Sequence, residues 1–149
     1  MLLPMRVLFL CTGNSCRSQM AEGWARSMWP EGLEAVSAGT KPHGLDPRAI
    51  EVMAEAGIDI SVQSSQHLDE FPLDELDHVV TVCDSASQSC PAPPPGVQVT
   101  HAPFDDPPRL ARELEDPTDV MAAYRRVRDE IRSFVERFGR DQSPGQDGA

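Results

Sequence analysis

The sequence predicts an α/β fold with three layers, in which helices flank a four-stranded parallel sheet. Four short apolar runs alternate with segments in which apolar residues recur every three or four positions, as in β-α-β units. Hydrophobic and charged residues make up 40% and 25% of the chain, the proportions of an ordinary globular domain. The 149 residues suffice for one such domain, which we place at residues 1–138.

The first strand and the loop after it open this domain. Arg6–Leu10 is a short apolar run, and the polar residues Cys11–Arg17 follow it as a loop. Ser18 is the expected N-cap of a helix, because apolar residues then recur at positions 21, 24, 25 and 28. Leu33–Ala38 alternates in polarity and is predicted to be the second strand.

A second helix and a third strand are predicted in the middle of the chain. Asp46 followed by Pro47 is a strong helix start, and Gly57 is suited to end that helix. Residues 58–77 are polar and irregular, with at most a helical turn. His78–Val82 is apolar enough to be a buried strand.

A fourth strand and a long helix complete the predicted fold. Val97–His101 is the strand, and residues 102–119 contain four prolines, so they are expected to be irregular until a helix begins near Pro117. That helix carries apolar residues on one face as far as Phe138. Residues 139–149 are polar and glycine-rich and are predicted to be a disordered tail.

The charge of the chain limits its partners. Thirteen lysines and arginines against 24 acidic residues give a formal net charge of −11. We therefore expect neither nucleic acid nor an anionic membrane as a partner. The apolar start is not expected to be a signal segment, because Arg6 interrupts it and Leu10 stands where a lipoprotein site needs a small residue. We expect a cytoplasmic monomer with reduced cysteines.

A thiol and an arginine bracket the loop after the first strand. Between Cys11 and Arg17 stand Thr12, Gly13, Asn14, Ser15 and Cys16. The amides of a tight loop that leads into a helix form an anion site, and Gly13 and Asn14 tolerate the left-handed backbone that such a loop needs. Arg17 offers two parallel N–H donors to a tetrahedral oxyanion. This positive environment is expected to lower the pKa of Cys11, so the loop predicts an oxyanion site around a nucleophilic thiolate.

Two further residues are candidates for proton chemistry. Ser18 either caps the helix or donates its hydroxyl to the thiolate. The segment Phe104–Pro107 follows the fourth strand, whose carboxyl end lies at the same edge of a parallel sheet as Cys11. An acid placed there protonates a departing oxygen. We favour Asp106 over Asp105, because the following proline restricts the backbone of Asp106.

The remaining cysteines predict redox chemistry. Cys83 ends the third strand, and Cys90 follows seven residues later. Neither their spacing nor that of Cys11 and Cys16 suits a zinc site. A thiol relay fits better, in which Cys83 attacks an adduct on Cys11 and Cys90 then takes over the disulfide. Cys16 either forms a protective disulfide with Cys11 or has no role.

Together these motifs resemble one known family. They are CTGNSCRSQMAEG at 11–23, SAG at 37–39, VTVC at 80–83, CP at 90–91, FDDP at 104–107 and RRVRDEI at 125–131. In this order, from about residue 5 to residue 138, the chain is similar to the thioredoxin-coupled arsenate reductases built on the low-molecular-weight protein tyrosine phosphatase fold. The resemblance implies a four-stranded parallel sheet flanked by helices and an enzyme.

The resemblance also implies a reaction cycle. Cys11 attacks arsenate held by Arg17 and the loop amides, and Asp106 protonates the departing hydroxide. Cys83 then attacks Cys11 of the adduct and releases arsenite, and Cys90 resolves the Cys11–Cys83 bond. Thioredoxin reduces the resulting Cys83–Cys90 disulfide. The mycothiol-dependent relatives lack the third cysteine, so its presence favours thioredoxin.

Some members of this family bind a monovalent cation such as potassium beside the loop. Its ligands map to Asn14, Glu22 and Ser37, but Gln66 stands where the fourth ligand is an aspartate. The sequence therefore does not favour a potassium site, and we expect no metal and no tightly bound cofactor.

Two other functions remain open at the level of sequence. A phosphatase acting on phosphomonoesters would use Cys11 through a phosphocysteine intermediate. Related tyrosine phosphatases carry aromatic residues after the Asp-Pro pair, whereas this chain reads Pro108-Arg109, which favours the reductase. The third alternative is an oxyanion-binding or redox-sensing module without turnover.

Overall fold

The structure is a computed structural model that describes residues 4–82 and 95–142. Its strands lie within one residue of the predicted positions: β1 (Met5–Leu10), β2 (Leu33–Ala38), β3 (His78–Thr81) and β4 (Gln98–His101). They pair in parallel in the order β2-β1-β3-β4. The predicted α/β fold with a four-stranded parallel sheet flanked by helices is therefore confirmed.

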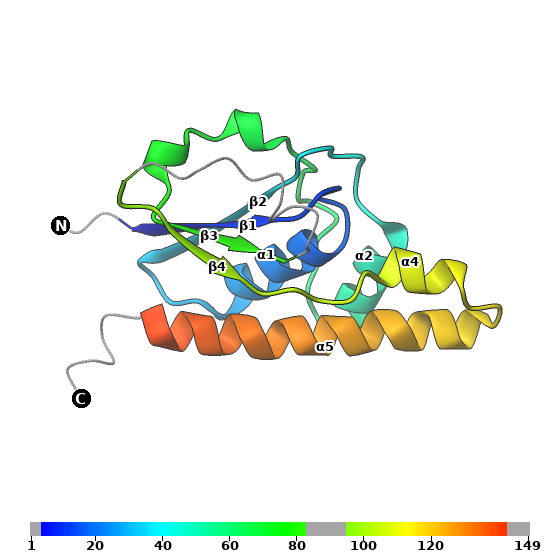
Figure 1. Cartoon of the computed structure of the whole chain (residues 1–149). Helices are drawn as coiled ribbons and strands as arrows, with labels where there is room; N and C mark the ends of the chain where they lie inside the picture. Colours follow the sequence, from blue (N-terminus) through cyan, green and yellow to red (C-terminus); the bar gives the residue numbers. More distant parts are fainter. Residues whose placement is uncertain (1–3, 83–94, 143–149) are drawn as a thin grey trace.

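The two faces of the sheet are covered unequally. The helices are α1 (Arg17–Met28), α2 (Pro47–Glu55), α4 (Pro107–Arg112) and α5 (Pro117–Gln142), and two 3₁₀ turns are η1 (Leu68–Glu70) and η2 (Leu73–Glu75). Figure 1 shows α1 and α5 on one face and the two turns on the other. In the described ranges the third layer of the predicted fold thus consists of short turns. No helix there is long and apolar enough to span a bilayer.

The central strand anchors the core. Residues 7–10 of β1 are fully buried, as expected for a parallel strand covered on both faces. The ring of Phe9 lies 5.7 Å from that of Trp29, at the end of α1, and Trp29 stacks on Phe138 of α5, also at 5.7 Å. These aromatic contacts fix both helices against the sheet.

The helix α2 begins and ends as the sequence predicts. Asp46 is its N-cap and accepts a hydrogen bond from the backbone N–H of Arg48 at 2.9 Å, with Pro47 as the first helical residue. Gly57 has a φ of 85°, in the left-handed region where a glycine is favoured after the helix end.

The helices α1 and α4 differ from the prediction. The N-cap position of α1 is Cys16, whose side chain makes no capping hydrogen bond, so the prediction of Ser18 as the cap is wrong. The segment of α4 was predicted to be irregular because of its prolines. Pro107 and Pro108 occupy its first turn, where a backbone N–H has no helical partner to lose and the fixed φ of proline suits the helix.

The last helix is longer than the sequence predicts. It continues past Phe138 to Gln142, so the predicted disorder is wrong for residues 139–142. Gly139 is buried against the ring of Trp29, where a Cβ atom would find no room. This packing outweighs the low helix propensity of glycine. Residues 143–149 lie outside the described residues.

The topology places one loop at the centre of the sheet edge. The chain leaves β1 toward β2 on one side and returns to β3 on the other, so the strand order reverses next to β1. Open α/β sheets bind ligands outside the carboxyl ends of their strands at such a point. The loop that follows β1 therefore occupies the expected ligand position.

His78 should make the stability of the fold depend on pH. Its ring is buried, contacts Phe138 edge-on at 4.9 Å and hydrogen-bonds the Thr100 hydroxyl at 2.6 Å. Burial lowers the pKa of His78 below its ordinary value of 6.5. As the pH falls through that ordinary value, the unfolded chain gains a proton that the folded chain excludes, and folding is weakened.

The free energy of unfolding should therefore decrease from about pH 7.5 to about pH 5.5, and His78→Gln should flatten this dependence. Urea unfolding at several pH values measures both slopes. Equal slopes in the two proteins would rule His78 out as the cause.

Candidate oxyanion site

The loop after β1 lines a cavity of about 290 Å³. The lining comes from three segments: Cys11, Thr12, Gly13, Ser15, Cys16 and Arg17 from this loop, His43 from the segment after β2, and Asp106, Pro108 and Arg112 from the segment after β4. The structure thus brings together Asp106, Arg17 and most of the loop residues that the sequence singles out.

Four successive carbonyl groups of this loop are held from outside it. The pairs are Lys41 N to Thr12 O at 2.8 Å, His43 N to Gly13 O at 3.1 Å, Gln19 Nε2 to Asn14 O at 2.9 Å and Asp46 N to Ser15 O at 2.9 Å. In a trans peptide the carbonyl of one residue and the N–H of the next point in opposite directions. The N–H groups of residues 13–16 are therefore turned to the inner side of the loop, as an anion site requires.

Asn14 holds the strained point of the loop. Its φ is 45°, in the left-handed region, as the sequence predicts for this residue. The buried side chain donates to the hydroxyl oxygens of Ser18 at 2.8 Å and Ser37 at 3.0 Å, and accepts from the N–H of Gln66 at 2.7 Å. These three bonds stabilise a backbone conformation that costs an L residue about 1 kcal/mol or more. Ser18 is thus a partner of Asn14.

Two glycines allow close approach to the loop. Of the two residues suited to left-handed backbone, Asn14 adopts it and Gly13 is not among the described residues with positive φ. A side chain there would instead collide with the ring of His43. A Cβ atom at Gly39 would lie 2.5 Å from the carbonyl oxygen of Thr12 and 2.7 Å from that of Cys11. Position 39 therefore requires glycine for space, whereas a side chain at Gly13 would displace the His43 ring from the cavity.

Arg17 connects the loop to the segment after β4. Its Nη1 donates to the carbonyl oxygen of Phe104 at 2.9 Å, and its Nη2 lies 3.6 Å from Oδ1 of Asp106. The Nε of Arg17 is buried and has no hydrogen-bond partner in the described part of the chain. A buried donor without a partner is unfavourable, so an anion that accepts from it would be stabilised.

The two adjacent aspartates face different ways. Asp106 lines the cavity, and although it is the N-cap residue of α4 its side chain makes no capping hydrogen bond. Asp105 is exposed and pairs with Arg126 of α5 at 3.0 Å. Asp106 is therefore the carboxyl group available at the cavity, the one that the sequence favours.

The four cysteines separate into two pairs. Cys11 and Cys16 are both buried. Burial, and next the charge of Asp46, raise the pKa of Cys16 well above its ordinary value, so this thiol stays protonated near neutral pH and is a weak nucleophile. Cys83 and Cys90 lie outside the described residues.

The residues expected around a monovalent cation gather beside the loop but do not fit one. The Ser37 hydroxyl donates to Oε1 of Glu22 at 2.6 Å, and Nη2 of Arg26 lies 2.6 Å from Oε2 of Glu22. The side-chain oxygen of Asn14 accepts from Gln66. These oxygens already face protein donors, and Arg26 supplies the positive charge. Within residues 4–82 and 95–142 no group of three His, Cys, Asp or Glu is placed to hold a metal ion.

Sequence reasoning does not single out His43 or Arg112, because neither belongs to a motif. His43 reaches the cavity through the backbone pairing of its segment with the loop. Arg112 reaches it because Pro107 and Pro108 begin α4, which carries the arginine to the cavity one turn later. The proline pair is the available signal, because proline fits the first turn of a helix as well as irregular structure.

Comparison with known proteins identifies the family. The family model for low molecular weight phosphotyrosine protein phosphatases matches residues 6–142. Arsenate reductases of Bacillus subtilis and Staphylococcus aureus are 47% and 46% identical to this chain over 132 residues, which are 89% of this chain and 93% and 94% of theirs.

Solved structures agree with this result. The arsenate reductase of Archaeoglobus fulgidus superposes with a TM-score of 0.71 at 32% identity, covering 89% of this chain and 98% of its own. A low molecular weight protein tyrosine phosphatase of T. tengcongensis gives 0.69 at 28% identity, covering 90% and 97%. The chain belongs to the low molecular weight phosphotyrosine protein phosphatase family, on its arsenate reductase branch.

Proposed function

We propose that the protein reduces arsenate to arsenite, with Cys11 as nucleophile and Cys83 and Cys90 as the thiols that complete the reduction. The observation that carries the proposal is the cavity lined by Cys11, the inward-turned loop amides and Arg17, whose Nε has no hydrogen-bond partner among the described residues. Two more cysteines follow in the sequence, and hydrolysis alone would not need them. Relatives 43% to 47% identical are arsenate reductases, which supports the same activity here.

The first step forms a bond between sulfur and arsenic. The Cys11 thiolate attacks arsenate bound by the loop amides and Arg17, and one oxygen of arsenate departs. Asp106 lines the same cavity and donates the proton that lets this oxygen leave as water. The buried hydroxyl of Ser18 accepts a hydrogen bond from Asn14, which supports the loop, and in this scheme it donates its own proton to the Cys11 thiolate.

The second step transfers two electrons to arsenic. Cys83 attacks Cys11, the electron pair of the sulfur–arsenic bond passes to arsenic, and arsenite leaves together with formation of a Cys11–Cys83 disulfide. Cys90 then attacks Cys83, which frees Cys11 and leaves a Cys83–Cys90 disulfide. Thioredoxin supplies the next two electrons. Solved relatives include an arsenate reductase in reduced, intermediate and oxidised states, which supports a redox cycle of this kind.

The second candidate function is hydrolysis of phosphomonoesters. It is favoured by the family itself and by a solved relative with phosphate bound, an arsenate reductase 31% identical to this chain. The same Cys11, Arg17 and Asp106 would form and hydrolyse a phosphocysteine. Weak phosphatase activity is compatible with either function, so the ratio of the two activities distinguishes them.

Cys90→Ser should stop multiple turnover but permit a single one. With thioredoxin, thioredoxin reductase and arsenate, the unmodified protein should oxidise NADPH continuously, and phosphate should give no oxidation. In Cys90→Ser each chain should release about one arsenite and remain as a Cys11–Cys83 disulfide, detectable by mass spectrometry. Cys83→Ser should release none.

Undiminished steady-state reduction by either variant would refute the relay. If neither oxyanion causes NADPH oxidation while phenyl phosphate is hydrolysed efficiently, the phosphatase is the better description of the protein.

Arg17→Lys should weaken arsenate binding by about 10- to 100-fold. Lysine keeps the charge but loses the forked donors and the bond to the Phe104 carbonyl, and charge-assisted hydrogen bonds contribute about 1.5–3 kcal/mol each. The inhibition constant of inorganic phosphate against NADPH oxidation measures the loss. Arg109→Lys, an exposed change on α4, is the matched control. Equal inhibition constants for the two variants would contradict this role of Arg17.

A further inference from the structure

A second cavity adjoins the oxyanion cavity. It has a volume of about 390 Å³ and shares Ser15, His43, Pro108 and Arg112 with the oxyanion cavity. A single tetrahedral ion is held by the loop alone, whereas cavities of about 300 Å³ and more hold organic ligands. The second cavity therefore offers space for a group attached to the oxyanion.

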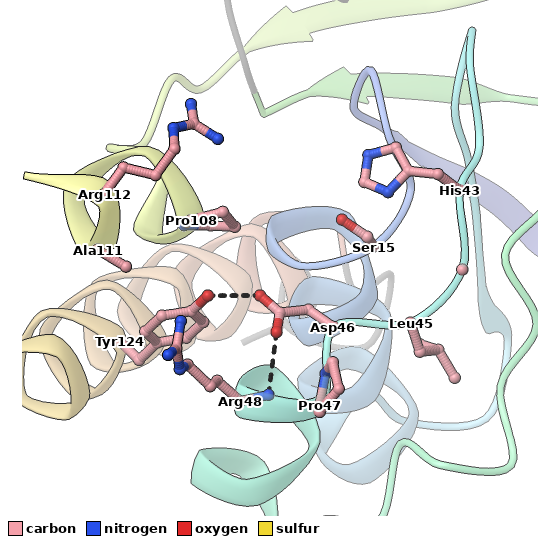
Figure 2. A pocket seen from close by; sticks show the side chains of 11 residues that line it. Ser15, His43, Leu45, Asp46, Pro47, Arg48, Pro108, Ala111, Arg112 and Tyr124 are labelled. Atoms are coloured by element: carbon pink, nitrogen blue, oxygen red, sulfur yellow. Dashed lines mark hydrogen bonds between the residues drawn. The ribbon is translucent and has the colours of Figure 1, made fainter. Parts of the chain in front are cut away.

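Two arginines give the second cavity a positive lining, although the whole chain carries a net charge of −11. Arg48 comes from α2 and Arg112 from α4, on opposite sides of the cavity (Figure 2). The carboxylate among the lining residues is Asp46, and both of its oxygens accept hydrogen bonds. Oδ1 accepts from the backbone N–H of Arg48 at 2.9 Å, and Oδ2 accepts from the Tyr124 hydroxyl at 2.6 Å.

The rest of the lining includes a buried tyrosine and several apolar residues. Tyr124 is buried, and burial together with Asp46 raises its pKa far above the ordinary value, so its hydroxyl stays protonated. Leu45 and the prolines at 47 and 108 complete walls that suit a flat organic group. An organic group with a terminal anion matches both the walls and the arginines.

We propose that the second cavity is a subsite for the organic part of a phosphomonoester that carries a carboxylate. The phosphoryl group lies in the oxyanion loop and Arg48 binds the carboxylate, while Arg112, which lines both cavities, adds positive charge to each. Charge-assisted hydrogen bonds from arginine to a carboxylate are strong and directional, so they favour this ligand class over neutral esters. The inference rests on the oxyanion-binding part of the proposed function and is independent of the cysteine relay.

The test measures binding to full-length Cys11→Ser, which cannot form a phosphocysteine. The probes are phenyl phosphate, 3- and 4-carboxyphenyl phosphate, and 4-carbamoylphenyl phosphate as a neutral isostere, all compared by titration calorimetry. At least one carboxyphenyl phosphate should bind about tenfold more tightly than the phenyl and carbamoyl compounds. Inorganic phosphate should displace every probe, because all of them occupy the oxyanion loop.

Two further variants assign the effect to the subsite. When Arg48→Met is added to the Cys11→Ser protein, the ratio of carboxyphenyl to phenyl affinity should fall close to one. Arg109→Met removes the same charge from an exposed position on α4 that lines neither cavity, so it should leave the ratio unchanged. Circular dichroism verifies that each variant is folded.

The subsite is overturned if the carboxylate does not increase the affinity or if none of the probes binds. It is also overturned if Arg48→Met keeps the increase in affinity, or if Arg109→Met abolishes it to the same extent. A protein that shows the expected ratio but does not reduce arsenate would refute the relay and leave the subsite intact. A protein that reduces arsenate without showing the ratio would refute the subsite alone.

Discussion

The hydrogen bonds that hold the loop carbonyls outward are the constraint on which the site depends. Without them, the peptide groups of residues 12–16 could direct carbonyl oxygens at a bound anion and repel it. Three of the donors, the N–H groups of Lys41, His43 and Asp46, come from the segment after β2. This segment reaches the loop because β1 and β2 pair in parallel along their whole length and because Gly39 lets the two backbones meet. The pairing of β1 with β2 therefore determines that the loop carbonyls face outward and the loop N–H groups face the cavity.

A buried charge supports the same loop from behind. Glu22 is 2% exposed, and burial raises its pKa in spite of its bonds to Arg26 and Ser37. Burying a carboxylate is unfavourable unless it is paired and hydrogen-bonded, and this one has both a guanidinium and a hydroxyl. Ser37 also accepts a hydrogen bond from Asn14, so it links Glu22 to the one non-glycine residue in the described ranges with a positive φ. The network thus stabilises a strained backbone on which the loop geometry depends.

The parts of the fold and site that could be predicted are those that are local in sequence. Apolar periodicity identified the strands and the long helix, and residue types alone identified the loop from Cys11 to Arg17. The sequence does not predict α4, because prolines usually indicate irregular structure. Proline is also favoured in the first turn of a helix, where Pro107 and Pro108 lie. The sequence offers two roles for Ser18, a helix cap or a donor to the thiolate, and the structure excludes the cap because Cys16 holds that position. His43 was beyond prediction, because only the pairing of distant segments brings it to the cavity.

An anion site in a strongly acidic chain requires that short-range interactions outweigh the overall field. Salt screens the distant acidic residues within about 8–10 Å, whereas hydrogen-bond donors in contact with the ion are not screened. Of the acidic groups that line the two cavities, Asp106 lies 3.6 Å from the cationic Arg17, and both oxygens of Asp46 already accept hydrogen bonds. The chain therefore gains little from charge at a distance and must select its ligand by fit. An anion without oxygens directed at the loop donors would meet the same unfavourable field and make none of the compensating bonds.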